Sequence, residues 1–192
     1  MRASYLTRAA ALLLIAFGAW YAGQGAWIHA KAWLAQRLIQ HAWTRTLAGE
    51  RMVKPWPWAD TWPVARLSVP RLAIERHVLA GAHGATLAFG PGHASGTVPP
   101  GEAGNSMVGG HRDTHLAFLG DLRPGDEIVV ERRDGARVRY RVDRFQVLDR
   151  RDVWIASQDG PSRLTLVTCY PLDAWRVGGD ERYAVIAERV PG

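Results

Sequence analysis

The longest run of hydrophobic residues in the chain lies close to the N-terminus. Residues 9–28 are apolar or glycine except for Gln24. About 20 apolar residues suffice for a helix to cross a bilayer, and Trp20, Tyr21 and Trp27 are of the types that favour the bilayer interface. The pattern predicts a membrane anchor over residues 1–28. A cleaved signal peptide, with small residues around 22–26, is the alternative.

A helical repeat continues beyond this run. Ile28, Ala32, Ala35 and Ile39 recur at spacings of three and four, which places them on one face of a helix. We interpret this segment as a stalk that extends the anchor; a helix lying in the lipid interface is the alternative, since the segment is rich in tryptophan. A Trp- and Pro-rich stretch follows, in which proline disfavours helix. Residues 29–63 are therefore predicted as a helical stalk and linker.

From residue 64 onward the pattern changes to short strands. Asp134-Gly135 separates two alternating runs, which is a strong hairpin signal. Residues 81–104 are rich in glycine and proline and predict a long loop. Apart from a short turn near residues 116–119, no helix is predicted. About seven or eight strands argue for a single, mostly-β barrel or sandwich over residues 64–192.

Charge and cysteine content restrict the function classes. The net charge is +6, but Arg137, Arg139 and Arg141 alternate with apolar residues, as on the solvated face of a sheet. This distribution disfavours nucleic acid as a partner. Cys169 is the only cysteine, so an intramolecular disulfide and a cysteine-rich zinc site are excluded.

Cys169 ends a strand-like run, Thr-Leu-Val-Thr-Cys at residues 165–169. A single thiol is usually a small buried hydrophobe. As a thiolate it is a strong nucleophile, and a nearby cation favours that form. His111 is suited to proton transfer, and Arg182 has the fork of N–H donors that an oxyanion needs. Composition alone leaves both interpretations open.

Five motifs in order resemble the sortase family. They are GPGH at 90–93, GEAGN at 101–105, GGHRDTH at 109–115, DLRPGD at 121–126 and TLVTC at 165–169. The resemblance covers about residues 64–190, with Cys169, His111 and Arg182 at the family's catalytic positions. The N-terminal span and the helix after it are most similar to the class GN sortases of Gram-negative bacteria.

The resemblance implies a closed β-barrel of about eight strands, preceded by a transmembrane helix and a stalk helix. It implies cleavage of an LPxTG-like sorting signal by Cys169 through a thioester, with His111 as general acid and base and Arg182 holding the substrate or the oxyanion. Thr168 and Trp175 are expected to bind substrate. The loop 170–181 would border the substrate, and its second arginine, Arg176, is a weaker rival to Arg182.

The resemblance also sets expectations for partners. The substrate would be a secreted protein with a C-terminal sorting signal, the acceptor an unidentified amine, and no cofactor is expected. Charge counting does not settle orientation, so the extracytoplasmic placement of the catalytic domain at the cytoplasmic membrane rests on the resemblance.

Several alternatives stay open or are disfavoured. His93, His111 and His115 are candidate metal ligands, but only one thiol is available and His115 follows a turn instead of lying on a clear helix, and no calcium-loop pattern is present. A cysteine protease that passes the acyl group to water, and a non-catalytic tethered β domain, are the alternative functions.

Overall fold

A computed structural model describes residues 2–174 and 178–191 of the chain. The chain forms two compact units, residues 1–37 and 38–192. Helix α1 (Arg2–Leu47) begins in the first unit and ends in the second. Trp175 and Arg176, two residues of interest in the sequence, lie outside the described residues.

The first unit is the greater part of α1, and its residues 9–23 are apolar or glycine on every face. Leu12, Leu13 and Phe17 have 67%, 71% and 61% of their side chains exposed. A helix with apolar residues on every face is suited to burial in protein or lipid. It is the one helix among residues 2–174 and 178–191 that is long and apolar enough to cross a bilayer, which is consistent with a membrane anchor.

The last turns of α1 belong to the second unit and pack within it. Ile39, Ala42 and Trp43 are each only 1% exposed, at the helical spacing of three and four that makes one face. The Trp43 ring meets the ring of His77 edge-on, with centroids 6.2 Å apart. The helix ends at Leu47, and residues 48–62 form irregular structure up to the first strand.

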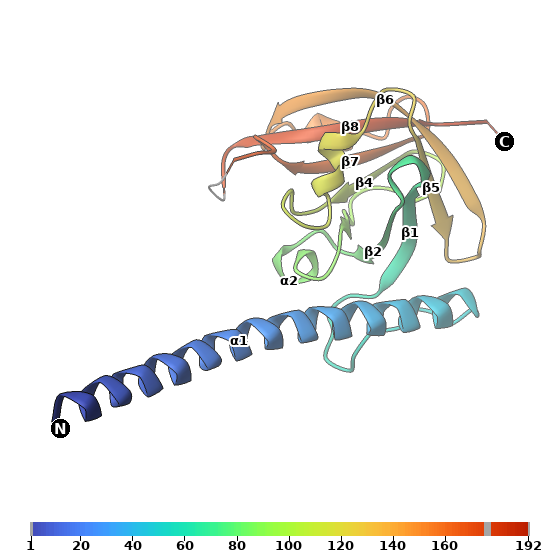
Figure 1. Ribbon diagram of the computed structural model, residues 1–192. Coiled ribbons are helices and arrows are strands. Elements are labelled where there is room, and N and C mark those ends of the chain that lie inside the picture. The colour runs from blue at the N-terminus through green and yellow to red at the C-terminus, as the bar shows by residue number, and fades with distance from the viewer. Residues whose placement is uncertain (1, 175–177, 192) are drawn as a thin grey trace. The chain divides into compact units, whose positions relative to one another are not determined.

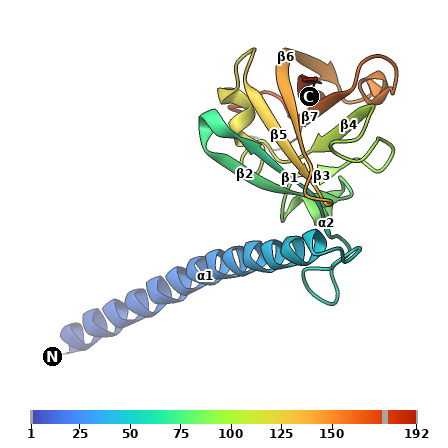
Figure 2. The ribbon, with the colours of Figure 1, turned by 90° about the vertical axis from the view of Figure 1, so that its right-hand side faces the viewer.

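Eight strands close into a barrel in the order β1-β2-β3-β4-β7-β8-β6-β5, and they curve round a common interior in Figures 1 and 2. This confirms the expected closed barrel of about eight strands. The strands are β1 (Pro63–Val69), β2 (Ile74–Ala80), β3 (Gly92–His93), β4 (Asn105–Gly109), β5 (Glu127–Arg132), β6 (Arg137–Asp149), β7 (Arg163–Cys169) and β8 (Glu181–Arg189). In the described part of the chain four short helices lie between strands, namely η1 (Pro70–Leu72), α2 (Gly84–Leu87), η2 (Ala117–Asp121) and η3 (Val153–Ala156).

The structure differs from the sequence prediction in short elements. The alternating run predicted after Gly135 continues as one long strand, β6, to Asp149, and its pairing with β8 passes through an irregularity between Val142 and Arg144. Such a bulge keeps a strand continuous while shifting its alternation. The helices α2, η1 and η3 and the two-residue strand β3 were not predicted, since none is long enough to show a period.

The barrel has an inner core and a smaller apolar cluster outside it. Leu164 and Leu166 of β7 and Val185 of β8 belong to the inner core. The residues between them face outward, where Val167 packs with Ala184 and Ile155. Alternate residues of a strand point to opposite faces, so β7 is buried on both sides over most of its length.

Candidate active site

Parallel pairing of β4 with β7 brings His111 and Cys169 to the same end of the barrel. Gly109 pairs with Val167, and the Gly110 N–H donates to the Val167 carbonyl at 3.1 Å. His111 lies two residues beyond Gly109, and Cys169 lies two residues beyond Val167. The register therefore puts the last paired residues of the two strands at the same level, and His111 and Cys169 each follow two residues later.

Arg182 lies opposite Cys169 on β8, the strand that pairs with β7 on the side away from β4. The two residues are paired in the antiparallel β7–β8 ladder, and opposite residues present their side chains on the same face. Cys169 is a free thiol of intermediate burial. Arg182 Nη1 donates to the carbonyls of Gly179 and Glu181, each at 2.8 Å. Its Nε and Nη2 have no hydrogen-bond partner among the described residues.

A groove of about 250 Å³ lies on the outer face of the barrel beside this row. Its apolar lining includes Leu148, Ile155 and Val167, and Arg182 is part of the same lining. Val167 is two residues before Cys169, so both side chains project to the outer face of β7. The apolar lining therefore lies on the same face of β7 as the nucleophile candidate.

The polar side of the groove carries Asp149, Arg150 and Asp152. The Arg151 guanidinium donates to Asp149 at 2.8 Å, and together with the Arg151 backbone N–H it holds the pKa of that carboxyl well below its usual range. Asp149 is thus a carboxylate with a fixed partner, and Asp152 accepts a hydrogen bond from the Asp149 backbone at 2.9 Å. These bonds shape the turn from β6 into η3.

His111 is exposed at the end of this row. The side chains of His111, Cys169 and Arg182 form no direct hydrogen bond with one another within the described chain. This placement is compatible with a catalytic site, since catalytic hydrogen bonds are often long in free enzymes. The roles of the three residues stay predictions.

The structure describes only one of the two predicted substrate-binding residues, Thr168. Thr168 is 2% exposed, and its hydroxyl donates to the Gly110 carbonyl at 2.8 Å. This bond joins the ends of β4 and β7, whereas direct contact of Thr168 with substrate stays a prediction. Trp175 lies outside the described residues.

The histidines considered as metal ligands do not form a cluster with one another or with acidic side chains. No group of three His, Cys, Asp or Glu residues that could hold a metal ion lies within residues 2–174 and 178–191. His93 Nε2 contacts the Val98 carbonyl at 2.9 Å. Burial lowers the pKa of His115, whose ring is 3.5 Å from the Ala88 carbonyl.

Sequence reasoning missed a buried arginine next to His111. Arg112 Nη1 donates to the Pro171 carbonyl and its Nη2 to the Ala174 carbonyl, both at 2.7 Å. These acceptors lie in the loop that follows Cys169. The sequence gives no signal for such a contact, because backbone carbonyls carry no residue type that a pattern can reveal.

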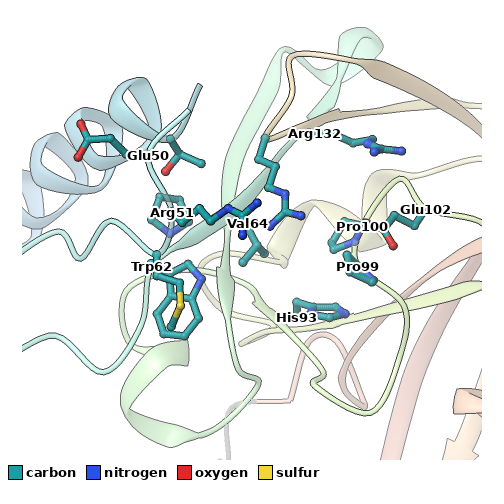
Figure 3. A pocket seen from close by; sticks show the side chains of 13 residues that line it. Glu50, Arg51, Trp62, Val64, His93, Pro99, Pro100, Glu102 and Arg132 are labelled. Carbon is teal, nitrogen blue, oxygen red and sulfur yellow. The ribbon is translucent and has the colours of Figure 1, made fainter. Parts of the chain in front are cut away.

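A larger cavity of about 310 Å³ lies away from this row, and Figure 3 shows its lining. Trp62, Pro99 and Pro100 contribute apolar surface, and Arg132 and His93 contribute polar groups. His111, Cys169 and Arg182 are not among its lining residues. Arg182 lines the groove on the outer face of β7, so that groove is the better candidate for a reaction at Cys169, although it is the smaller space and neither Cys169 nor His111 is among its lining residues.

Comparison with known proteins gives a consistent result. Residues 67–190 match the model of the sortase domain. Sortase D of Bacillus subtilis is 29% identical over 125 residues, which make up 65% of this chain and 62% of that protein. The chain thus aligns with less than two thirds of the length of this curated relative.

Solved structures agree with this match. Sortase C-1 of Actinomyces oris is 29% identical, with a TM-score of 0.59 over 68% of this chain and 74% of that one. A sortase D5 transpeptidase of Clostridium perfringens has a TM-score of 0.60 over 68% of this chain and 80% of that one; at 24% identity it supports the fold. Since the family model covers more than half of the sequence, the chain belongs to the sortase family.

Proposed function

We propose that this protein is a sortase transpeptidase that cleaves an LPxTG-like sorting signal and transfers the acyl group to an amine. The observation that carries the proposal is the row at the rim of the outer groove. Cys169 and Arg182 face each other across two strands, and His111 lies two residues beyond the paired end of the neighbouring strand β4. A nucleophile, a proton-transfer group and a fixed cation are the groups that acyl transfer needs.

In the first half of the reaction the Cys169 thiolate attacks the threonine carbonyl of the sorting signal. A carbon–sulfur bond forms, and the negative charge moves to the carbonyl oxygen. Arg182 donates hydrogen bonds to that oxygen or holds the peptide beside it. The carbon–nitrogen bond to glycine then breaks, and His111 supplies the proton that the departing amine takes up.

In the second half an amine attacks the thioester. A new carbon–nitrogen bond forms, the carbon–sulfur bond breaks, and His111 removes the proton that the amine gives up. The sulfur leaves as the thiolate with which the cycle began. Water in place of the amine gives hydrolysis by the same steps, and this is the alternative function.

The groove supports recognition of the apolar part of the signal. Its lining of Leu148, Ile155 and Val167 suits an aliphatic side chain or a proline, because burying such a group releases about 25 cal/mol per Å² of apolar surface. Arg182 at the same lining then lies near the backbone that follows. In the proposed complex the carbonyl of the signal reaches Cys169, which is two residues beyond Val167 on the same face of β7.

The location also belongs to the proposal. Helix α1 supports a single-pass anchor in the cytoplasmic membrane, with the barrel on the extracytoplasmic side, where secreted substrates pass. The N-terminal span and its helical continuation support membership in class GN, and the partner would be a secreted protein with a C-terminal sorting signal. The acceptor is an amine of unspecified source.

A peptide assay tests transfer against hydrolysis. The full-length chain in detergent is incubated with an LPxTG-type peptide, with and without a small primary amine, and products are identified by mass spectrometry. We expect cleavage between threonine and glycine, and an amine adduct when the amine is present. Hydrolysis with no adduct at any amine concentration would assign a protease, and a cleavage rate unchanged in Cys169→Ala would reject both.

A further inference from the structure

The segments that carry His111 and Cys169 are joined by few strand contacts. The paired residues of β4 and β7 end at Gly109 and Val167, and Gly110 adds one backbone bond to Val167. Thr168 adds the hydroxyl bond to the Gly110 carbonyl. Beyond Gly110 strand pairing no longer sets how His111 faces Cys169.

Arg112 provides the next connection between the two segments. Its two terminal nitrogens bond the carbonyls of Pro171 and Ala174, each at 2.7 Å. Pro171 is two residues after the nucleophile candidate and Ala174 is five residues after it. One side chain next to His111 therefore holds two points of the loop that leaves Cys169.

The burial of Arg112 makes these bonds costly to lose. Its side chain is 4% exposed, whereas Asp113, its ion-pair partner at 3.2 Å, is 64% exposed. A guanidinium removed from water needs acceptors, and the two loop carbonyls lie within the short range of charge-assisted bonds. The shape of the loop and the position of Arg112 thus depend on each other.

The base of the same loop is closed by strand-like contacts. The Tyr170 N–H donates to the Glu181 carbonyl at 3.1 Å, just past the pairing of Cys169 with Arg182. Cys169 is therefore held on one side by β8 and on the other by a turn that Arg112 fixes to the His111 segment. Loss of the Arg112 bonds would free that turn without breaking the barrel.

We propose that Arg112 is a positioning residue that fixes the loop after Cys169 against the His111 segment and so sets the geometry of the Cys–His pair. This inference rests on the proposed roles of Cys169 and His111. Arg112 acts through these neighbours and needs no contact with substrate. A displacement of about 1 Å in a catalytic pair can lower a rate by about 100-fold.

Arg112→Lys is the main test, because lysine keeps the charge but cannot span two carbonyls as a planar fork does. In the full-length chain we expect kcat with the sorting-signal peptide to fall by roughly 10- to 100-fold, with a smaller change in KM. Arg112→Gln also removes the charge, and its kcat is expected to fall further than that of Arg112→Lys. Arg132→Lys is the matched control, since Arg132 also reaches a loop carbonyl, that of Gly101 at 3.5 Å.

Alkylation by iodoacetamide gives a readout that does not depend on sortase activity. Cys169 is the only cysteine in the sequence, so the rate reports on that thiol alone. We expect the pH profile of alkylation to change in Arg112→Lys and to stay as in the wild type in Arg132→Lys. If the variant shows a lower Tm but a wild-type alkylation profile and a wild-type kcat, Arg112 is structural only and the inference is wrong. Failure of the peptide assay in the wild type would instead reject the proposed function, and the alkylation profile would still decide the role of Arg112.

Discussion

The two faces of β7 differ in what they do for the molecule. On the inner face Leu164 and Leu166 are fully buried in the barrel core. On the outer face Val167 lines a groove, and Cys169, a thiol of intermediate burial, follows two residues later on the same face. The same seven-residue strand thus supplies packing to one side and proposed chemistry to the other. Substitutions of inward-facing residues are therefore expected to change stability, and substitutions of outward-facing residues near Cys169 are expected to change activity.

The largest effect is expected at the end of the outer face. Cys169→Ala removes the nucleophile, and loss of a covalent nucleophile costs roughly 10³-fold or more in kcat. The barrel should be unaffected, because the thiol is not part of either apolar cluster. Peptide cleavage and a thermal melt of the same sample measure the two quantities. A large fall in Tm together with activity would show that the thiol is also structural.

On the inner face of β7 the expected effect is on stability. Leu166→Ala leaves a cavity in the core, which costs about 2–5 kcal/mol in the free energy of unfolding. Chemical denaturation of the full-length chain measures this loss. The folded fraction should keep wild-type kcat per active site, determined by titration of Cys169. A fall in kcat per titrated site without loss of stability would contradict the division between the faces.

Substitution of Arg182 on the neighbouring strand β8 is a second way to separate activity from stability. Arg182→Lys keeps the charge but loses the fork, and loss of an oxyanion donor costs roughly 100-fold in kcat. Stability should change little, since among the described residues the Arg182 guanidinium bonds only the carbonyls of Gly179 and of Glu181, the exposed first residue of β8. Steady-state kinetics with the sorting-signal peptide gives the number. Near-normal turnover would remove Arg182 from the site.

The smallest effect concerns an outer face that carries packing instead of chemistry. His77 of β2 contacts Trp43 of α1, and its Nε2 is buried without a hydrogen-bond partner in the described chain. Burial lowers the pKa of His77 below its ordinary value of 6.5. The unfolded chain then binds more protons just below pH 6.5, so stability is complete above that pH and is lost as the pH falls towards the folded pKa.

His77→Phe removes this titration and keeps a ring against Trp43. The loss of stability between pH 7.5 and 5.5 should therefore be smaller in the variant than in the wild type, measured by denaturant midpoints at both pH values. His115, whose pKa burial also lowers, titrates in both proteins and cancels in the difference. Equal acid sensitivity of the two proteins would mean that His77 does not differ between the folded and unfolded states.

Long periodic patterns and complete motifs were predictable from the sequence. The apolar run before residue 28 and the repeat after it gave α1, and the motif containing Cys169 gave the end of β7. The barrel closure came from the family resemblance, because strand counting alone left a sandwich open. Class GN, the substrate contacts of Thr168 and the role of each site residue stay predictions.

Other features depend on contacts that leave no pattern in the chain. The helix η3 supplies Ile155 to the groove, yet four residues do not show a helical period. In the sequence Arg112 looks like any other arginine beside an aspartate. Its 4% exposed side chain and its bonds to two loop carbonyls distinguish it in the structure. Such residues act through the backbone of distant segments, which a single sequence does not pair.

Closure of the barrel limits the ways in which a peptide can be recognised. Within the described residues, β7 pairs with β4 over residues 163–167 and with β8 over residues 163–169, so an extended peptide cannot add to β7 as a further strand over its doubly paired length. Main-chain recognition by strand addition, which tolerates many sequences, is therefore excluded at that part of β7. Selectivity of the proposed site is expected to come from side chains of the outer groove and from the turns at its ends, where a change of specificity needs no repacking of the barrel.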